Sequence, residues 1–164
     1  MKKTKYWACA LALALVIWPL AVPRAALRCY PTARFAVLAG GLVRDTLTQL
    51  VWQQDGSGAR AGCAQGTTCT WAEAKAYCAG LVLGGFSGFR LPTAKELSSI
   101  VNFTMTGPVA IDQIAFPNTP GVAFWTSSPS AYFSSSAWYV DFASGYLDDY
   151  YGGVGNNYRV RCVR

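Results

Sequence analysis

The chain has 164 residues, a formal net charge of +6 and no histidine. Four of its 14 basic residues precede residue 27, so the remainder carries ten basic against eight acidic residues, a net charge of +2. Such a balanced remainder excludes an electrostatic footprint for nucleic acid. The absence of histidine excludes the commonest general base and the Ser-His and Cys-His catalytic pairs.

Residues 1–26 are predicted to be a secretory signal peptide. Three lysines precede an apolar stretch that Pro19 interrupts, which is the pattern of a cleaved export signal. The stretch is shorter than the ~20 residues that span a bilayer, so we expect membrane contact only through export. Residues 27–164 are predicted to form one domain that is secreted, periplasmic or displayed at the cell surface.

Residues 47–52 are predicted to form a strand, and two helices are predicted after it. The helices should cover residues 71–81 and 94–101, because Thr70-x-x-Glu73 and Thr93-x-x-Glu96 are capping boxes. In a capping box, the threonine and glutamate side chains satisfy the exposed backbone donors of the first turn.

Five cysteines follow residue 26, and in an exported chain their default role is disulfide bonding. A local bridge could close the polar loop between Cys63 and Cys69. Cys78 and Cys162 would then join the first helix to the last strand, which leaves Cys29 as a free thiol or a link to another chain. Zinc is the rival interpretation, but the chain lacks histidine and paired Cys-x-x-Cys hooks, so we expect no metal.

The later strands are predicted at residues 124–126, at 138–142 and at the end of the chain. Alternation over 138–142 predicts that Trp138, Val140 and Phe142 face the core, whereas Tyr139 and Asp141 point away. In the last strand, the alternating residues Tyr158, Val160 and Cys162 should face inward and Arg159, Arg161 and Val163 outward. The predicted fold class is α+β, with two helices packed on a largely antiparallel sheet.

Residues 129–163 are built mainly from Tyr, Ser, Gly, Asn and Asp. Antibody loops favour the same set, because Tyr gives a large amphipathic contact area and the small residues give adaptable hydrogen bonding. A turn-rich antiparallel sheet would have a similar composition, so this alternative stays open. The candidate ligand-binding residues are Tyr132, Ser134, Ser135, Tyr139, Tyr146, Asp148, Asp149, Tyr150, Tyr151, Asn156, Asn157, Tyr158 and Arg159.

Two ionic roles are weighed for the same region. Asp148 and Asp149 with Asn156 and Asn157 could supply oxygen ligands to calcium, but solvated turn carboxylates are the favoured interpretation. The arginines of the chain could bind sulfate groups by bidentate hydrogen bonds, or they could pair with neighbouring aspartates on the same sheet. The arginines concerned are Arg34, Arg90, Arg159, Arg161 and Arg164, and the aspartates are Asp141, Asp148 and Asp149.

Several sequence blocks occur in the order typical of one family. Among them are QLVWQ at 49–53, WAEA at 71–74, RLPT at 90–93, FPNT at 116–119, FWTSS at 124–128, WYVDF at 138–142 and VRCVR at 160–164. Together they resemble the C-terminal domain family of the Legionella collagen-like adhesin, Lcl. The resemblance implies a surface-displayed module with a C-type-lectin-like fold, which in some members binds sulfated glycans. It also implies a fold relationship to formylglycine-generating enzymes.

The C-terminal stretch also resembles that of retroelement-diversified variable proteins, in which such residues vary between fixed core positions. The expected partner is therefore a glycan, sulfated glycans included, or a protein, and the alternative is a diversified receptor whose binding surface is 130–159. An enzyme of the formylglycine-generating type would need reactive cysteines, whereas Cys78 and Cys162 are expected to form a bridge. We expect no catalytic residues and no cofactor, and the sequence leaves the oligomeric state open.

Overall fold

The computed structural model describes residues 34–58, 60, 62–104 and 107–164. These residues belong to one compact unit, Thr32–Arg164. The predicted signal peptide and Cys29 lie outside the described residues, so both stay predictions. In the described part of the chain, no helix combines the length and the apolar character needed to cross a membrane.

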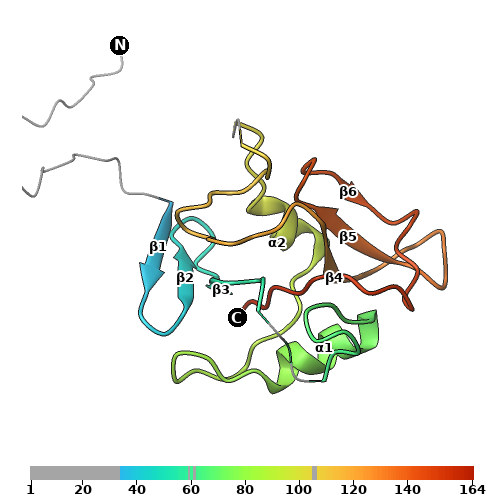
Figure 1. Ribbon diagram of the computed structural model, residues 1–164, viewed down its shortest axis with the longest axis horizontal. Coiled ribbons are helices and arrows are strands. Elements are labelled where there is room, and N and C mark those ends of the chain that lie inside the picture. Colours follow the sequence, from blue (N-terminus) through green and yellow to red (C-terminus); the bar gives the residue numbers. More distant parts are fainter. Residues whose placement is uncertain (1–33, 59, 61, 105–106) are drawn as a thin grey trace, which may run out of the picture. The chain divides into compact units, whose positions relative to one another are not determined.

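The first sheet is a three-stranded antiparallel meander (Figure 1). Its strands are β1 (Phe35–Leu38), β2 (Leu42–Asp45) and β3 (Val51–Gln53), with β2 in the middle. The turn between β1 and β2 contains Gly40 at a φ of +80°, and a Cβ there would lie 2.5 Å from the Cα of Gly84. Only glycine permits both this backbone conformation and this close approach.

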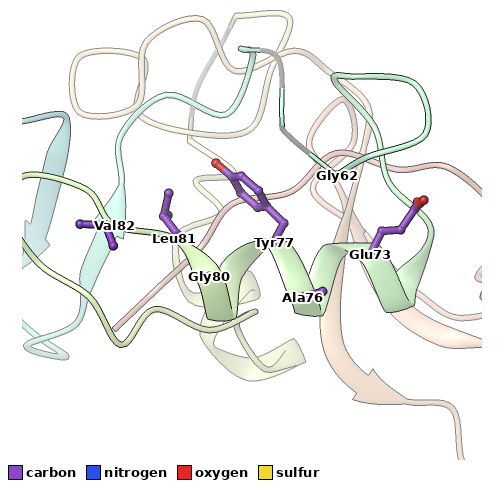
Figure 2. A pocket seen from close by; sticks show the side chains of 7 residues that line it. All are labelled: Gly62, Glu73, Ala76, Tyr77, Gly80, Leu81 and Val82. Atoms are coloured by element: carbon purple, nitrogen blue, oxygen red, sulfur yellow. The ribbon is translucent and has the colours of Figure 1, made fainter.

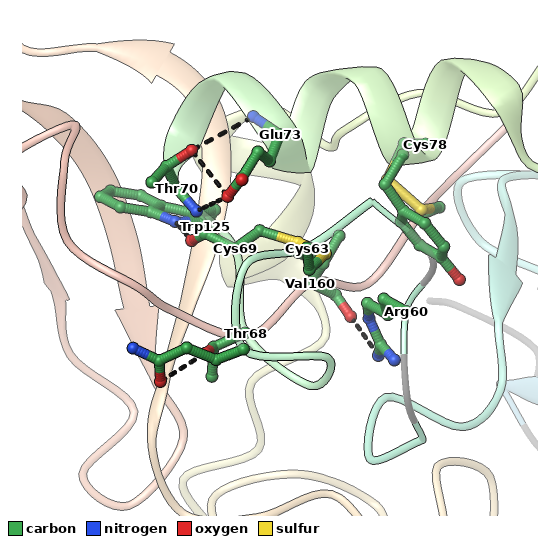
Figure 3. The surroundings of a disulfide bond; sticks show 12 residues. Arg60, Cys63, Thr68, Cys69, Thr70, Glu73, Cys78, Trp125 and Val160 are labelled. Carbon is green, nitrogen blue, oxygen red and sulfur yellow. Dashed lines mark hydrogen bonds between the residues drawn. A yellow bond between two sulfur atoms is a disulfide. The ribbon is translucent and has the colours of Figure 1, made fainter.

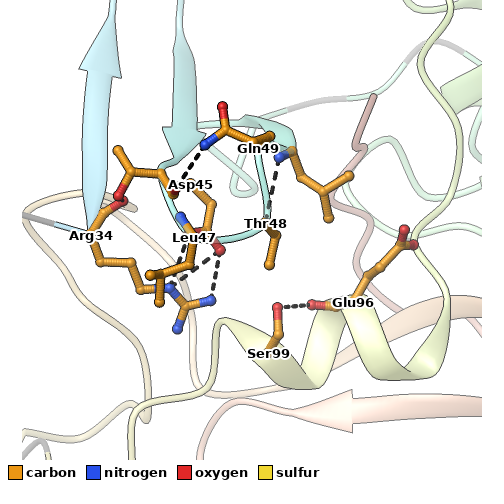
Figure 4. Close-up of polar contacts among 9 residues, drawn as sticks. Arg34, Asp45, Leu47, Thr48, Gln49, Glu96 and Ser99 are labelled. Carbon is orange, nitrogen blue, oxygen red and sulfur yellow. Dashed lines mark hydrogen bonds and ion pairs between the residues drawn. The ribbon is translucent and has the colours of Figure 1, made fainter.

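The strand predicted at residues 47–52 is shorter than expected, because β3 begins only at Val51. A turn precedes it, held by the Asp45 carboxylate, which accepts from the Leu47 amide at 2.9 Å and from the Arg34 guanidinium at 2.6 Å (Figure 4). Burial would raise the pKa of Asp45, but these hydrogen bonds hold it below its ordinary value. Gln49 then adopts a positive φ of 64°, which extended strands do not allow.

The second sheet contains β4 (Ala123–Pro129), β5 (Ala137–Asp141) and β6 (Leu147–Asp148). It is also antiparallel, and β5 lies between the other two strands (Figure 1). The predicted strands at 124–126 and 138–142 are thus confirmed with shifted ends. The α+β class is confirmed as well, and the architecture is compatible with a C-type-lectin-like fold.

Both predicted helices begin where their capping boxes place them. Helix α1 (Trp71–Gly80) follows the N-cap Thr70, and helix α2 (Ala94–Ser99) follows the N-cap Thr93. In each box, the threonine hydroxyl accepts from the glutamate amide, while the glutamate carboxylate accepts from the threonine amide. The helices end one and two residues earlier than predicted.

The β4–β5 ribbon is buried on both faces, which the alternation analysis did not anticipate. Phe124, Val140 and Phe142 pack with α2 residues in one core cluster, whereas Trp125 and Tyr139 pack with α1 residues in the other. The prediction that Tyr139 points away from the core is therefore wrong, since this residue is only 8% exposed. The prediction that Trp138 faces the core is wrong as well, because Trp138 is half-buried and belongs to neither cluster. A sheet covered on both sides buries alternate residues in different clusters rather than exposing half of them.

The last segment connects the two sheets by isolated bridges and does not form the continuous strand that was predicted. Tyr158 bridges to Cys69 and Arg159 to Phe124, while Val163 bridges to Trp52. Both Arg161 and Val163 are fully buried, so their predicted outward orientation is wrong. Residues 160–163 of the segment are buried on every side, whereas Tyr158 and Arg159 are half-buried and Arg164 is exposed.

Two disulfides fasten this arrangement, as the cysteine spacing predicts. Cys63 is bonded to Cys69, and Cys78 on α1 is bonded to Cys162 in the last segment. The Cα atoms of these pairs lie 4.6 and 5.4 Å apart, within the usual span for a disulfide. Helix α1 and the chain end are thus covalently tied.

Candidate functional site

A groove walled by tyrosines lies at the β4–β5–β6 sheet, and we call it the tyrosine groove. Its volume is about 450 Å³. Strands β4, β5 and β6 contribute Ala123, Tyr139, Asp141 and Asp148 to it, and flanking loops supply the rest. The complete lining is Gly121, Val122, Ala123, Tyr139, Asp141, Ser144, Tyr146, Asp148, Tyr151 and Tyr158.

Tyr139 and Tyr158 are firmly packed within this lining. The Tyr158 ring lies 4.5 Å from the Trp125 ring and 5.0 Å from the Tyr139 ring, centroid to centroid. Its hydroxyl donates to the Tyr151 carbonyl oxygen at 2.5 Å. Burial, followed by the neighbouring Asp148 carboxylate, raises the pKa of Tyr139 to about 12, so this phenol stays neutral at physiological pH.

Two carboxylates accompany these phenols. Asp148 accepts the amides of Asp149 and Tyr150 at 2.7 and 2.9 Å, and the Tyr139 hydroxyl lies 3.4 Å from its second oxygen. Asp141 accepts the Ala143 amide at 2.9 Å. Each carboxylate therefore shapes a turn and still presents acceptor capacity to the groove.

Exposed aromatic rings continue the surface beyond the groove. The exposed fractions are 86% for Tyr132, 70% for Tyr146, 66% for Tyr150 and 67% for Tyr151. The Tyr150 ring makes edge contacts with the Tyr151 ring at 4.8 Å and with the Phe133 ring at 6.1 Å. We call Tyr132, Phe133, Tyr150 and Tyr151 the aromatic ridge.

The remaining predicted ligand residues have mixed environments. Ser134 and Ser135 are exposed, and so is Asn156, whose amide donates to the Tyr151 carbonyl at 2.7 Å. Asp149, in contrast, is 8% exposed and accepts the Ser130 hydroxyl at 2.6 Å, so little of its surface is open to a ligand. Asp149 thus supports the β6 turn.

A second hollow of about 300 Å³ adjoins the groove and shares Val122, Ala123 and Tyr158 with it. Thr68, Asn157 and Arg159 complete its lining. Arg159 is half-buried, and its guanidinium donates to the Ser57 carbonyl at 2.9 Å. Arg159 and Asn157 therefore border a different part of the surface from Tyr146 and Tyr151.

The arginines considered as sulfate ligands do not converge. Arg161 is fully buried, and its guanidinium donates to the carbonyls of Gln53 and Gln54 and to the Thr119 hydroxyl. Arg34 pairs with Asp45 and Arg90 with Glu96, rather than with the aspartates of the second sheet. Arg161 therefore takes neither of the two roles weighed for it, since it has no exposed surface for a sulfate and its hydrogen-bond partners are not aspartates.

The Cys63–Cys69 bridge, which lies close to Trp125 and the start of α1 (Figure 3), supports the groove through the backbone of Cys69. The backbone of Cys69 exchanges hydrogen bonds with that of Tyr158 at 2.9 and 3.0 Å. Its carbonyl also accepts from the Trp125 indole at 2.8 Å. The groove wall at Tyr158 is consequently held by a covalently closed loop that ends directly at the α1 N-cap.

Two other hollows contain none of the candidate residues of the C-terminal stretch, although the second includes Arg164, one of the arginines weighed for sulfate binding. One, of about 350 Å³, lies beside α1, where Glu73, Tyr77 and Val82 border it (Figure 2); the Glu73 carboxylate already caps the helix. The other, of about 290 Å³, lies between Arg44 and Arg164 at the first sheet. In the described ranges, no group of three or more Cys, Asp or Glu side chains converges as metal ligands would.

Asp141, Ser144 and the 121–123 segment belong to the groove but were missed as site residues. Asp141 carried a signal, since its outward position in the alternating pattern was recognised. The 121–123 segment carries no polar side chain, and only its place at the start of β4 brings it into the lining. Tertiary pairing, rather than a local motif, assembles this part.

The comparison with protein families agrees with the sequence blocks. The family model described as the Lcl C-terminal domain matches residues 41–164, which include the groove, the ridge and both disulfides. No curated protein matches the chain. Since the family model covers most of its length, the chain belongs to the Lcl C-terminal domain family, an adhesin-associated family.

Proposed function

We propose that this protein is an exported or surface-displayed binding module that captures its ligand in the tyrosine groove and on the aromatic ridge. The observation that carries the proposal is the exposure of Tyr132, Tyr146, Tyr150 and Tyr151, each at least 66%. Large aromatic rings dominate binding energy when a partner covers them. Phe133, Tyr150 and Tyr151 are in ring-to-ring contact, and a group of exposed aromatic rings is typical of an interaction site.

The construction of the surface supports the same function. The packed rings of Tyr139 and Tyr158 form a rigid wall, and the exposed rings stand beside it. A preorganised wall lowers the conformational cost of binding. The two disulfides stabilise the support and suit an oxidising, extracytoplasmic location.

An enzyme of the formylglycine-generating type is not supported. Such chemistry needs a reactive thiolate with access to substrate. Cys78 and Cys162 are joined and have no exposed surface. A binding module is therefore better supported for this chain than an enzyme of this type.

The diversified receptor is a second candidate, favoured by the interleaving of exposed and buried residues. Exposed Tyr146 and Tyr150 alternate along the chain with a fully buried framework that includes Val140 and Val160. Gly152 belongs to the framework, because a Cβ there would lie 2.0 Å from the Ala137 carbonyl oxygen. A diversified chain should therefore keep glycine at 152. An adjacent reverse transcriptase gene and an adenine-biased template copy would support this candidate, and their absence would remove it.

The proposed function is tested with the triple variant Tyr146→Ala, Tyr150→Ala and Tyr151→Ala. A glycan array and a protein pull-down with the oxidised wild-type chain first identify the glycan or protein that the chain binds. We expect the triple variant to lose this capture while its melting temperature changes little, because exposed substitutions usually shift stability by no more than about 0.5 kcal/mol each.

The matched control is Tyr158→Ala, which removes a packed ring of the same residue type. It should lower the melting temperature clearly, since the half-buried Tyr158 ring packs against Trp125 and Tyr139 and its removal should cost about 2 kcal/mol. Retention of full capture by the triple variant would contradict the proposal. A large drop in the melting temperature of the triple variant would instead mean that the rings of Tyr146, Tyr150 and Tyr151 are packed in the core.

A further inference from the structure

The tyrosine groove has a definite charge character. Asp141 and Asp148 line it, and its described lining contains no lysine or arginine. Among the described residues, neither carboxylate forms an ion pair, since the two ion pairs join Arg34 to Asp45 and Arg90 to Glu96. The groove is therefore anionic and open to a cation from outside.

The phenol rings add a second attraction for a cation. Tyr146 and Tyr151 bring largely exposed rings to the groove, and Tyr139 and Tyr158 form its packed wall. Aromatic faces attract ammonium and guanidinium groups through the ring quadrupole. Arginine adds planar stacking and a fork of donors that matches a carboxylate.

We infer that the tyrosine groove holds a cationic side chain, an arginine or lysine presented by a partner protein. This inference rests on the proposed function and names the chemistry of its ligand. The guanidinium or ammonium group lies against the tyrosine rings and donates to Asp148 and Asp141, while the aromatic ridge covers the apolar surface around it. The negative charge of the groove favours a partner protein that presents a positively charged side chain.

Anionic ligands fit this groove poorly. A sulfate group entering it would face two carboxylates without a compensating guanidinium, because Arg159 lies in the adjoining hollow and binds the Ser57 carbonyl. A neutral sugar could stack on the rings but would leave the negative charge of the groove uncompensated. Binding of a sulfated glycan and binding of a neutral sugar are the competing outcomes of the test.

The test is an NMR titration of the oxidised, ¹⁵N-labelled chain with four probes. The probes are acetyl-Gly-Arg-Gly-amide, the same peptide with citrulline in place of arginine, a sulfated heparin disaccharide and lactose. Citrulline preserves the shape of arginine but removes its charge. We expect the arginine peptide to shift the amide signals of residues 139–151, and to bind about fivefold more tightly than the citrulline peptide.

The double variant Asp141→Asn and Asp148→Asn should weaken arginine-peptide binding by about fivefold. Asparagine keeps an acceptor oxygen for the turn amides, so the fold is preserved. The matched control is Asp112→Asn, because Asp112 also accepts turn amides, those of Ile114 and Ala115, but lies outside the groove lining. This control should bind like the wild type, and the spread of amide signals verifies folding in each variant.

Each contrary result overturns the inference in a recognisable way. Equal binding of the arginine and citrulline peptides would show that charge plays no part. Shifts at residues 139–151 by the heparin disaccharide or lactose alone would assign the groove to a glycan, and the proposed binding function would stand. Absence of shifts there with all four probes also overturns the inference. The proposed function itself fails only if the triple tyrosine variant retains partner capture.

Discussion

Arg161 is a cation without exposed surface and without a carboxylate in hydrogen-bond contact. Burial, aided by the nearby Arg60 cation, lowers its pKa to about 9. Its Nη atoms reach the Gln54 carbonyl and the Thr119 hydroxyl, both at 2.6 Å, and the guanidinium carbon lies 4.7 Å from the centre of the Phe116 ring. At this position, arginine fastens the 53–54 backbone to the chain end.

We predict that Arg161→Met lowers the free energy of unfolding by about 3 kcal/mol, because it leaves several buried acceptors unsatisfied. Urea unfolding measures the change. The exposed Arg44 is the matched control, and Arg44→Met should change stability by less than about 0.5 kcal/mol. Equal effects of the two substitutions would mean that Arg161 does not hold the fold.

At the scale of elements, local signals predicted the helices well. The capping boxes at Thr70 and Thr93 set the first residues of α1 and α2, because a box is formed by residues only three positions apart. Helix ends were less predictable: the Ile100 amide binds the Leu97 and Ser98 carbonyls and closes α2 before residue 101. Such closure depends on tertiary surroundings that a local motif does not encode.

Alternation along a strand indicates which residues share a face, but it does not show whether the opposite face meets solvent or a second core cluster. It placed Val140 and Phe142 in the core correctly, but it failed for Tyr139 and Arg161, which lie in segments covered on both sides. The exposed tyrosines were predictable from composition, whereas the groove was not. The groove lining combines residues of β4, β5 and β6 with Tyr158 from the last segment. These residues are far apart in the sequence, so no local pattern predicts that they meet.

Helix α2 offers a pH-dependent test of its cap. Arg90 donates to both Glu96 oxygens at 2.7 and 2.6 Å, and this pairing, together with the Thr93 donors, lowers the pKa of Glu96 to about 2 from 4.5. The stabilisation is present above pH 4.5 and is lost as the pH falls toward 2, because the unfolded state takes up the proton first.

Glu96→Gln should therefore cost about 1 kcal/mol at pH 7 and almost nothing near pH 2. Chemical unfolding across this pH range measures the difference. Glu73→Gln is the control, because Glu73 forms the same capping box in α1 with no arginine bonded to its carboxylate. The loss of stability caused by Glu73→Gln should depend less on pH than the loss caused by Glu96→Gln. A pH-independent cost for Glu96→Gln would exclude the ionised pair as its cause.

At the scale of the whole molecule, the two disulfides close loops of very different lengths. Cys63 and Cys69 are 6 residues apart, whereas Cys78 and Cys162 are 84 apart. In the chain-entropy model, the short loop stabilises the fold by about 2 kcal/mol and the long loop by about 4.5 kcal/mol. The long bridge also joins α1 to the segment that spans both sheets.

We predict that the paired substitution Cys78→Ala and Cys162→Ala destabilises the protein about 2 kcal/mol more than Cys63→Ala and Cys69→Ala. Denaturant unfolding of the two double variants gives the comparison. The Cys63 and Cys69 pair should instead weaken ligand capture more than its stability loss explains, because Cys69 supports Tyr158 in the groove wall. The reverse order of stabilities would contradict the entropic account.

The central claim is that a disulfide-fastened scaffold presents the tyrosine groove and the aromatic ridge to a partner. Hydrogen–deuterium exchange with and without the most strongly captured ligand tests this most directly. The account predicts added protection in residues 121–123, 132–133 and 139–158, with little change in α1 and the first sheet. Protection confined to the hollow beside α1, or to the one between Arg44 and Arg164, would contradict it.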